Sequence, residues 1–304
     1  MTSLLLIGVV GFVAQLVDGA LGMGYGTTSA TLLLATGLTP AAASASVHLA
    51  EVGTTFVSGF SHWRFGNVDW RSVVLLALPG GVGGFAGAVL LSNVSASAAR
   101  PWVSAFLFLL GVYILVRFAL GRAKSPPSGR SFRARFLGPL GLGAGFLDAA
   151  GGGGWGAITT STLVASNRME PRRVLGSVSA SEFVVSLGAS IGFLLALSQQ
   201  GIGWATVGLL LAGGVIAAPI AAYVVKLADA RILGAAVGGM ILFTNADRFL
   251  AIIGLPAEVG TAVRALIVAV SIVAVAYAAR RIRRDHRVAA EARTQVVPAA
   301  LADV

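Results

Sequence analysis

Long apolar stretches separated by short polar loops run along almost the whole chain. They cover residues 3–37, 41–60, 71–92, 101–120, 138–166, 173–198, 203–225, 231–255 and 259–280. A helix needs about 20 residues to cross the ~30 Å hydrocarbon core of a bilayer, and most of these stretches reach that length. The pattern therefore predicts an all-α polytopic membrane protein.

Two of the stretches are interrupted by glycines beside an acidic residue. Residues 18–26 (DGALGMGYG) break the stretch 3–37, and residues 148–156 (DAAGGGGWG) break the stretch 138–166. Each glycine destabilises a helix by about 1 kcal/mol relative to alanine, so we expect the helix to unwind at both places. The piece before the second break, 138–147, holds ~10 residues and would reach only about halfway across the bilayer.

The two interrupted stretches are copies of one another. A shift of 130 positions pairs Asp18 with Asp148, and after one insertion a shift of 131 pairs Glu51 with Glu182. The same shifts pair Gly11 with Gly141, Tyr25 with Trp155, Gly26 with Gly156, Pro40 with Pro171 and Ser46 with Ser177. We therefore expect a first repeat over 1–120, a basic cytoplasmic linker over 121–137, a second repeat over 138–256, an additional C-terminal transmembrane helix over 257–285 and a cytoplasmic tail over 286–304.

Basic residues in the loops indicate that the two repeats are inverted. The region 117–135 carries six Lys and Arg residues, and such enrichment is typical of cytoplasmic loops. The loop after the first broken stretch is uncharged, whereas its counterpart holds Arg168, Arg172 and Arg173. In the next pair of equivalent loops, the basic residues fall in the first repeat instead. This predicts an N-terminus outside and a C-terminus in the cytoplasm, with seven full spans and two re-entrant hairpins. Paired short spans in place of the hairpins give the same sidedness, and that alternative stays open.

Composition restricts the class of protein further. Of 304 residues, 56% are hydrophobic and 11% charged, against about 25% charged in soluble domains, and the mean hydropathy is +0.87. A water-soluble globular fold and a disordered chain are both excluded. The net charge of +10 falls mostly in the loops, where it reports orientation, so no nucleic-acid partner is expected. The chain has no cysteine, which excludes disulfides, thiolate metal sites and cysteine nucleophiles.

The two breaks are the candidate substrate site. Unwound backbone at membrane depth is tolerated only where protein buries it or where it lines a wet cavity, and two such breaks in inverted halves point to a transport site near the midplane. The helices that follow would direct free N–H groups and positive dipole ends to the centre, which suits an anion. Candidate substrate-binding residues are Gly24, Tyr25, Gly26, Thr27, Thr28, Gly154, Trp155, Gly156, Thr159 and Thr160. The alternative is that the glycines only permit close helix packing, which accounts better for the glycines over 80–87.

Four acidic residues in the apolar stretches are candidates for ion coupling: Asp18, Asp148, Glu51 and Glu182. An ionisable residue at such depth is costly and is a functional candidate by default, and a buried carboxyl can exchange a proton. For Asp18 and Asp148, capping of a helix start is an equal alternative. His48 shares a helix face with Glu51 and joins them as a candidate proton relay, with a plain hydrogen-bonded histidine as the alternative. Because no second deep histidine and no cysteine accompany it, no metal site is predicted.

A third polar group interrupts the stretch 231–255. Asn245, Asp247 and Arg248 lie close together in it, and we expect them to form an outer turn with an internal ion pair. The alternative is that these side chains line the transport pathway.

The sequences of 11–26 and 145–156 resemble the TauE/SafE family, also called the sulfite exporter or toluene sulfonate uptake permease family, and the stretch 171–182 adds to the match. The resemblance covers about 5–280. It implies a permease of the bacterial inner (plasma) membrane for sulfur-containing anions such as sulfite, sulfoacetate and other organosulfonates, often acting as an exporter.

Together these observations predict a secondary transporter of small anions, coupled to protons and without a cofactor. The expected partners are the anionic solute, protons and membrane lipid, and a homo-oligomer stays open. Four buried acids with no deep Lys or Arg also leave open a cation transporter or channel. An intramembrane enzyme is disfavoured, because neither a Gly-x-Ser-Gly protease motif with a paired histidine nor His-Glu-x-x-His occurs.

Overall fold

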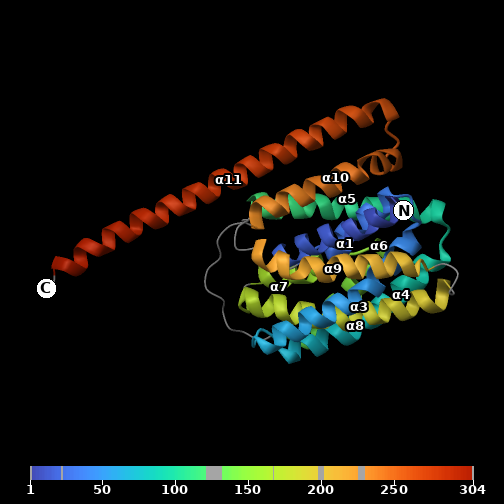
Figure 1. The fold of residues 1–304 in the computed structure, drawn as a ribbon, viewed down its shortest axis with the longest axis horizontal. Helices are drawn as coiled ribbons and strands as arrows, with labels where there is room; N and C mark the ends of the chain where they lie inside the picture. The colour runs from blue at the N-terminus through green and yellow to red at the C-terminus, as the bar shows by residue number, and fades with distance from the viewer. Residues whose placement is uncertain are drawn as a thin grey trace.

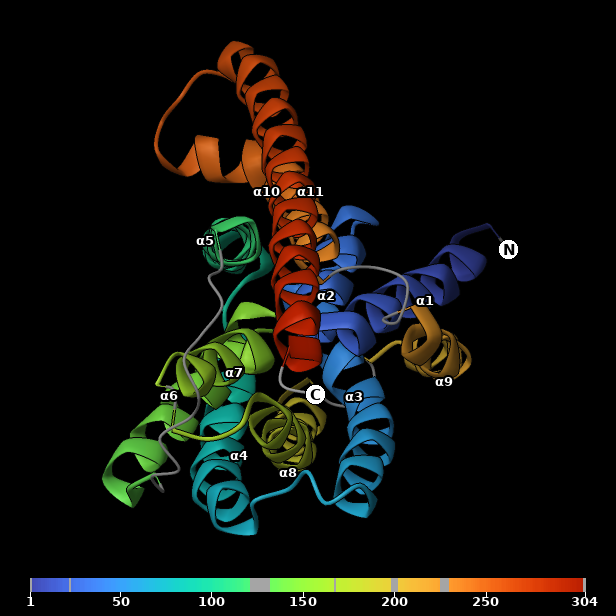
Figure 2. The ribbon, with the colours of Figure 1, turned by 90° about the vertical axis from the view of Figure 1, so that its left-hand side faces the viewer.

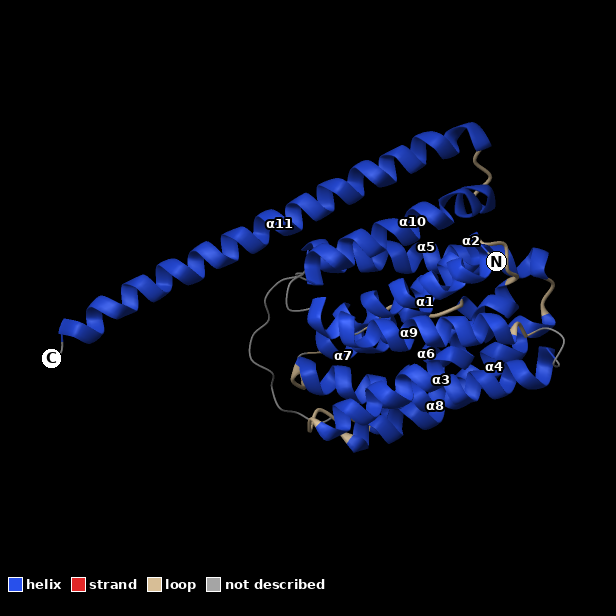
Figure 3. Cartoon of the chain, viewed as in Figure 1, coloured by secondary structure: helices blue, strands red, loops and turns tan. Residues whose placement is uncertain are grey.

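Helix is the only regular secondary structure in the part of the chain that the structure describes (Figure 3). This computed structural model describes residues 2–21, 23–120, 132–166, 168–197, 202–224 and 230–302. The elements are α1 (Thr2–Leu21), α2 (Tyr25–Ala35), α3 (Pro40–Arg64), α4 (Trp70–Asn93), α5 (Ala96–Leu120), α6 (Ala134–Gly151), α7 (Trp155–Ala165), α8 (Pro171–Leu197), α9 (Trp204–Val224), α10 (Ala230–Ile252) and α11 (Ala257–Ala302). The prediction of an all-helical fold is confirmed.

Short polar residues before the apolar stretches set where two of the helices begin. The Thr39 hydroxyl accepts the Ala42 N–H at 3.3 Å at the start of α3. The Asp69 carboxylate accepts the Ser72 N–H at 3.0 Å at the start of α4. Both contacts satisfy N–H groups that have no partner within their own helix.

Five of the described helices are long and apolar enough to cross a membrane. They are Trp70–Asn93, Ala96–Leu120, Arg173–Leu197, Gly234–Ile252 and Val259–Asp285. The segment Trp204–Ala217 is apolar but shorter. α3 has 25 residues and is long enough, but it carries His48, Glu51 and many hydroxyl groups. The protein is therefore a multi-pass membrane protein, while the count of seven full spans stays a prediction.

Both glycine-rich breaks unwind, as the sequence predicts, but both are shorter than expected, since α1 continues through Asp18 to Leu21 and α2 begins at Tyr25. α6 continues through Asp148 to Gly151, and the unwound residues Gly152, Gly153 and Gly154 have φ of +82°, +122° and +151°. Glycine accepts such angles because it has no Cβ. The expected half-helix over 138–147 is therefore wrong, because α6 has 18 residues and spans about 27 Å. Among the described helices, only those after the breaks, α2 and α7 with 11 residues each, have half the length of a span.

Helices from the two parts of the chain pack against each other in a reciprocal way. α4 packs against α6 and α8, while α9 packs against α1 and α3. α3 and α8 lie side by side, and so do α5 and α10. In the end-on view of Figure 2, α8 lies between α3 and α4, with α6 next to α4 and α9 next to α1. Each half therefore depends on the other for its packing.

Glycines allow these helices to approach closely. A Cβ on Gly145 would lie 2.1 Å from the Gly80 carbonyl oxygen, and one on Gly83 would lie 2.1 Å from the Leu142 carbonyl oxygen. The glycines of α4 thus bring its backbone against that of α6, which confirms the packing interpretation for the segment 80–87. The same device joins α1 to α9, where a Cβ on Gly213 would lie 2.2 Å from the Gly8 carbonyl oxygen.

The polar group in α10 forms no turn, so the expectation of an outer turn is wrong. The helix runs unbroken through it, because each polar side chain finds a partner on a neighbouring element. Asp247 pairs with Arg264 of α11 at 2.9 Å rather than with its neighbour Arg248. Arg248 donates to the Leu34 carbonyl oxygen at 3.4 Å, and Asn245 donates to the Thr31 hydroxyl at 3.5 Å. These side chains hold the short helix α2 and the last helix α11 against α10.

α11 is longer than the expected C-terminal span. It packs against α10 and then continues to Ala302 as a single helix that extends away from the bundle (Figure 1). The basic run that begins at Arg280 lies on this extension, and Arg231 of α10 pairs with Asp285 there at 2.7 Å.

Candidate functional site

The two glycine-rich breaks, which lie far apart in the sequence, touch each other. A Cβ on Gly153 would lie 2.3 Å from the Gly26 carbonyl carbon and 2.4 Å from the Thr27 backbone nitrogen. A Cβ on Gly26 would lie 3.0 Å from the Gly153 Cα atom and 3.0 Å from Glu51 Oε1. The segment after α6 is thus pressed against the start of α2, and the carboxyl of Glu51 reaches the contact.

Asp148 and Asp18 each cap the short helix that follows their break. Asp148 Oδ1 accepts the backbone N–H of Trp155 at 2.8 Å, at the start of α7. Asp18 accepts the backbone N–H of Tyr25, at the start of α2. Carboxylates are favourable there because the free N–H groups and the helix dipole both attract negative charge. The capping interpretation is therefore confirmed, and the positive helix ends already contact acidic groups of the protein.

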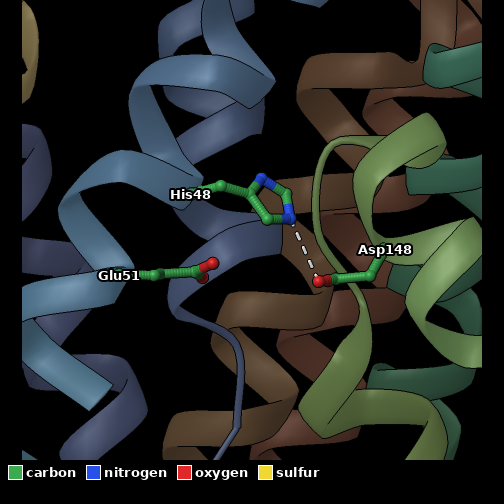
Figure 4. Close-up of side chains that lie close together, drawn as sticks. All are labelled: His48, Glu51 and Asp148. Atoms are coloured by element: carbon green, nitrogen blue, oxygen red, sulfur yellow. Dashed lines mark hydrogen bonds and ion pairs between the residues drawn. The ribbon is translucent and has the colours of Figure 1, made fainter. Parts of the chain in front are cut away.

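His48 and Glu51 extend from α3 towards Asp148 at the end of α6 (Figure 4). His48 Nε2 lies 3.1 Å from Asp148 Oδ2, and its other ring nitrogen, Nδ1, lies 2.8 Å from the Ser44 carbonyl oxygen. Glu51 Oε2 accepts a hydrogen bond from the Ser186 hydroxyl of α8 at 3.3 Å. His48 is 0% exposed, and Glu51 and Asp148 are 2% exposed. The three side chains form one buried cluster, built from helices of both halves.

Glu182 and Asp18 also belong to this cluster. Glu182 interacts electrostatically with Asp18 and Asp148, and Glu51 interacts with all three of these acids. Both Glu182 and Asp18 are only partly buried. Among the described residues, no hydrogen bond to the Glu182 carboxylate is found. The structure thus brings together all five side chains that the sequence indicates for ion coupling.

The candidate substrate-binding side chains fall into two groups. Tyr25 and Trp155 direct their polar atoms into the protein, where the Tyr25 hydroxyl and Trp155 Nε1 donate to the carbonyl oxygens of Leu210 and Val178, each at 3.3 Å. The hydroxyls of Thr27 and Thr159 donate to carbonyl oxygens of their own turn. The hydroxyls of Thr28 and Thr160, by contrast, are buried and have no partner within the described part of the chain. Of the polar side chains, those two remain available to a solute.

Sequence reasoning missed the two serines that orient the cluster, Ser44 and Ser186. Ser186 lies one turn after Glu182 on α8, so its spacing could have placed it near the acids. Ser44 lies one turn before His48 on α3, so the same spacing could have placed it beside the His48 ring. Its hydrogen bond to the Ala149 carbonyl oxygen on α6 has no sequence signal.

The cluster also has the donor atoms to hold a cation. His48, Glu51 and Asp148 each offer one nitrogen or oxygen atom, and these atoms all lie within 4.8 Å of one another. One imidazole and two carboxylates suit several divalent cations. The sequence alone does not predict such a site, because it places only His48 and Glu51 on one helix face. The fold adds Asp148 from the other half of the chain. No Lys or Arg precedes Arg64, and none lies between Arg135 and Arg168.

Long apolar helices around a buried acidic cluster define a polytopic helical membrane protein, and comparison with known proteins identifies its family. Residues 7–247 match the family model described as sulfite exporter TauE/SafE. The chain therefore belongs to the TauE/SafE family, a family of membrane transporters, as the resemblance predicts.

Two relatives from Bacillus subtilis (strain 168) are similar to this chain. It is 48% identical to the probable membrane transporter protein YtnM over 252 aligned residues, and this alignment covers 81% of this chain and 82% of the relative. It is 27% identical to the probable membrane transporter protein YdhB over 179 aligned residues, and this alignment covers 58% of this chain and 71% of the relative. Both are named as transporters rather than enzymes. No solved structure matches the chain.

Proposed function

We propose that this protein is a secondary transporter of small sulfur-containing anions, such as sulfite or organosulfonates, and that its transport is coupled to protons. One observation carries the proposal: two glycine breaks and five titratable side chains, contributed by both halves of the chain, converge on one buried cluster. The family description, sulfite exporter, supplies the substrate class. We place the protein in the bacterial cell membrane, with the N-terminus outside and the C-terminus in the cytoplasm.

The proposal includes two inverted repeats that alternate access to the cluster. The reciprocal packing of α4 on α6 and of α9 on α1 supports it, because a two-fold axis in the membrane plane would exchange these pairs. The unequal distribution of basic residues between equivalent loops supports it as well. The contact between Gly26 and Gly153 would then lie near that axis.

The charge of the cluster supports coupling to protons. It holds four carboxyls, and the helices that carry Asp18, Glu51 and Asp148 contain no Lys or Arg near them. An anion cannot bind beside ionised carboxylates without strong repulsion, so protonation of Glu51 and Glu182 must accompany its binding. The N–H groups and the Thr28 and Thr160 hydroxyls would donate hydrogen bonds to the anion, and no cofactor is needed.

Flux in proteoliposomes tests this function. Purified protein is reconstituted, a pH gradient is imposed, and movement of radiolabelled sulfite is followed with and without a protonophore. We expect flux that depends on the pH gradient and stops when the protonophore collapses it. Sulfite flux that is unaffected by the gradient would contradict the proton coupling, and the absence of flux for sulfite and for a set of organosulfonates would contradict the substrate class.

A cation transporter is the second candidate function, and the convergence of His48, Glu51 and Asp148 within 4.8 Å favours it. The same vesicles distinguish the two, because radiolabelled sodium can replace sulfite under an imposed sodium gradient. Sodium flux without sulfite flux would favour the second candidate.

A further inference from the structure

Ser44 of α3 connects its own helix to α6, the helix that carries Asp148, the partner of His48. It lies one turn before His48 on α3 and is 0% exposed. Its hydroxyl donates to the Ala149 carbonyl oxygen at 2.8 Å, directly after Asp148 on α6. Its own carbonyl oxygen lies 2.8 Å from His48 Nδ1. One residue thus holds the ring of His48 and the end of the helix that carries its partner.

The hydrogen bonds around His48 determine where hydrogens must be. A carbonyl oxygen can only accept, so His48 Nδ1 carries a hydrogen and donates it to Ser44. The Ser44 hydroxyl hydrogen is already donated to Ala149, so it is not available to Nδ1. Nε2 of a neutral ring then has only a lone pair, yet it lies 3.1 Å from Asp148 Oδ2. A hydrogen bond between these two atoms requires one more proton, carried either by the imidazolium or by the carboxyl.

We propose that Ser44 is a positioning residue of the transport site, which fixes His48 against Asp148 so that the pair holds one resident proton across the two halves of the chain. The inference rests on the transport function proposed above and assigns His48 and Asp148 a role different from that of Glu51 and Glu182. The glutamates exchange protons during transport, whereas the His48–Asp148 proton stays and keeps α3 and α6 together.

The second half of the chain has no such pair. The shift of 131 that relates Glu51 to Glu182 places Ser179 opposite His48 and Leu175 opposite Ser44. The acid opposite Asp148 is Asp18, which accepts the Tyr25 N–H. A single pair in a duplicated structure suits a fixed connection, because a proton carried in every transport cycle would be expected at the duplicated glutamates.

The charges around the pair favour retention of its proton. Glu51 of α3 lies beside it, and Asp18 of α1 and Glu182 of α8 also face Asp148 or Glu51. The Phe193 ring of α8 packs against the His48 ring, with ring centroids 5.9 Å apart. The pair is thus surrounded by acids on three helices and by an aromatic ring, and loss of its proton would add negative charge to that site.

Nitrogen NMR tests the position of the hydrogens. The chain has three histidines, so ¹⁵N-histidine labelling gives a simple spectrum, and the His48→Gln variant assigns the His48 signals. We expect the Nδ1 of His48 to carry a hydrogen, with the second proton between Nε2 and Asp148, unchanged from pH 6 to pH 8. A His48 ring with a bare Nδ1, or one that loses its second proton in this range, would overturn the proposal. This measurement does not depend on which solute is transported.

Transport by serine variants tests the positioning role. Ser44→Ala removes the hydrogen bond to Ala149, and we expect about five-fold slower sulfite flux together with a displaced pH profile. Ser46→Ala is the matched control, because Ser46 is a buried serine of the same helix whose hydroxyl donates to Ala42 in its own turn. It should leave the rate and the pH profile unchanged. A Ser44→Ala protein with the wild-type pH profile would overturn the role of Ser44, whatever its rate.

Discussion

Glu51 and Glu182 occupy equivalent positions in the two halves of the chain, yet their surroundings differ. Glu51 is buried, and its carboxylate accepts the Ser186 hydroxyl. Glu182 is partly exposed, and the described residues supply no hydrogen bond to its carboxylate. The residue that would serve it by symmetry is Thr55, but the Thr55 hydroxyl donates to the Glu51 carbonyl oxygen of its own helix. Duplication of a sequence therefore does not duplicate the environment of a side chain.

Glycines of the two breaks also have different surroundings. Gly153 lies against the backbone of the other break, whereas a Cβ on Gly24 would have no atom closer than 3.5 Å. Both residues have positive φ, but of these two glycines only Gly153 lies against the backbone of the opposite break, which it contacts at Gly26 and Thr27. The predictions below test these differences, from the largest expected effect to the smallest.

Glu182→Gln should abolish flux driven by a pH gradient, with a loss of at least about 100-fold, because a proton carrier cannot be replaced by an amide. The protein should stay folded, since the carboxylate accepts no hydrogen bond from the described residues. Proteoliposome flux and size-exclusion profiles check both points. Undiminished gradient-driven flux in this variant would remove Glu182 from the coupling mechanism.

Gly153→Ala should destabilise the protein by about 3 kcal/mol, because the new Cβ meets backbone atoms and the φ of +122° disfavours any side chain. Gly24→Ala should cost only about 1 kcal/mol, from backbone strain alone. Thermal unfolding in detergent, followed by circular dichroism, measures the difference. Gly143→Ala is the control, since a Cβ there has open space. Equal losses at Gly153 and Gly24 would show that the contact between the breaks does not form.

Thr28→Val and Thr160→Val should each raise the KM for the anion about three- to ten-fold, because each removes a donor that has no partner within the described chain. Stability should not fall, since no hydrogen bond of the protein is lost. Thr159→Val is the comparison, because that hydroxyl already donates to the Trp155 carbonyl oxygen. A KM change confined to Thr159→Val would place the solute elsewhere.

Ser186→Ala should slow flux about three-fold, because Glu51 loses a hydrogen bond that orients its carboxylate. Thr55→Val is the matched control: it changes the counterpart residue but leaves the Glu51 carboxylate untouched, so the expected change is less than about two-fold. Initial rates at saturating solute measure both. A larger effect of Thr55→Val would contradict the conclusion that Ser186, and not its counterpart Thr55, serves a glutamate carboxylate of the site.

Much of the site could be predicted from the sequence, for physical reasons that specific residues illustrate. A carboxylate in an apolar stretch is costly enough to indicate Asp18, Asp148, Glu51 and Glu182 without knowledge of their neighbours. The unwinding at Gly152–Gly154 follows from the weak helix propensity of consecutive glycines. The extent of the break did not follow, because helix α6 is supported beyond its own propensity by contacts with α4, and it therefore continues past Asp148.

The sequence by itself determined the apolar helices, the two breaks and the acids, because each depends on local composition and on the cost of placing a charge in hydrocarbon. Only the tertiary structure decided that His48 lies against Asp148, that Ser186 serves Glu51, and that Asp247 pairs with Arg264 rather than with Arg248. Each of these contacts joins residues that are distant in the chain, and their hydrogen bonds depend on separations of about 3 Å that helix packing sets. Apolar patterning specifies which residues are buried, but which polar groups then meet depends on how the buried helices pack against one another.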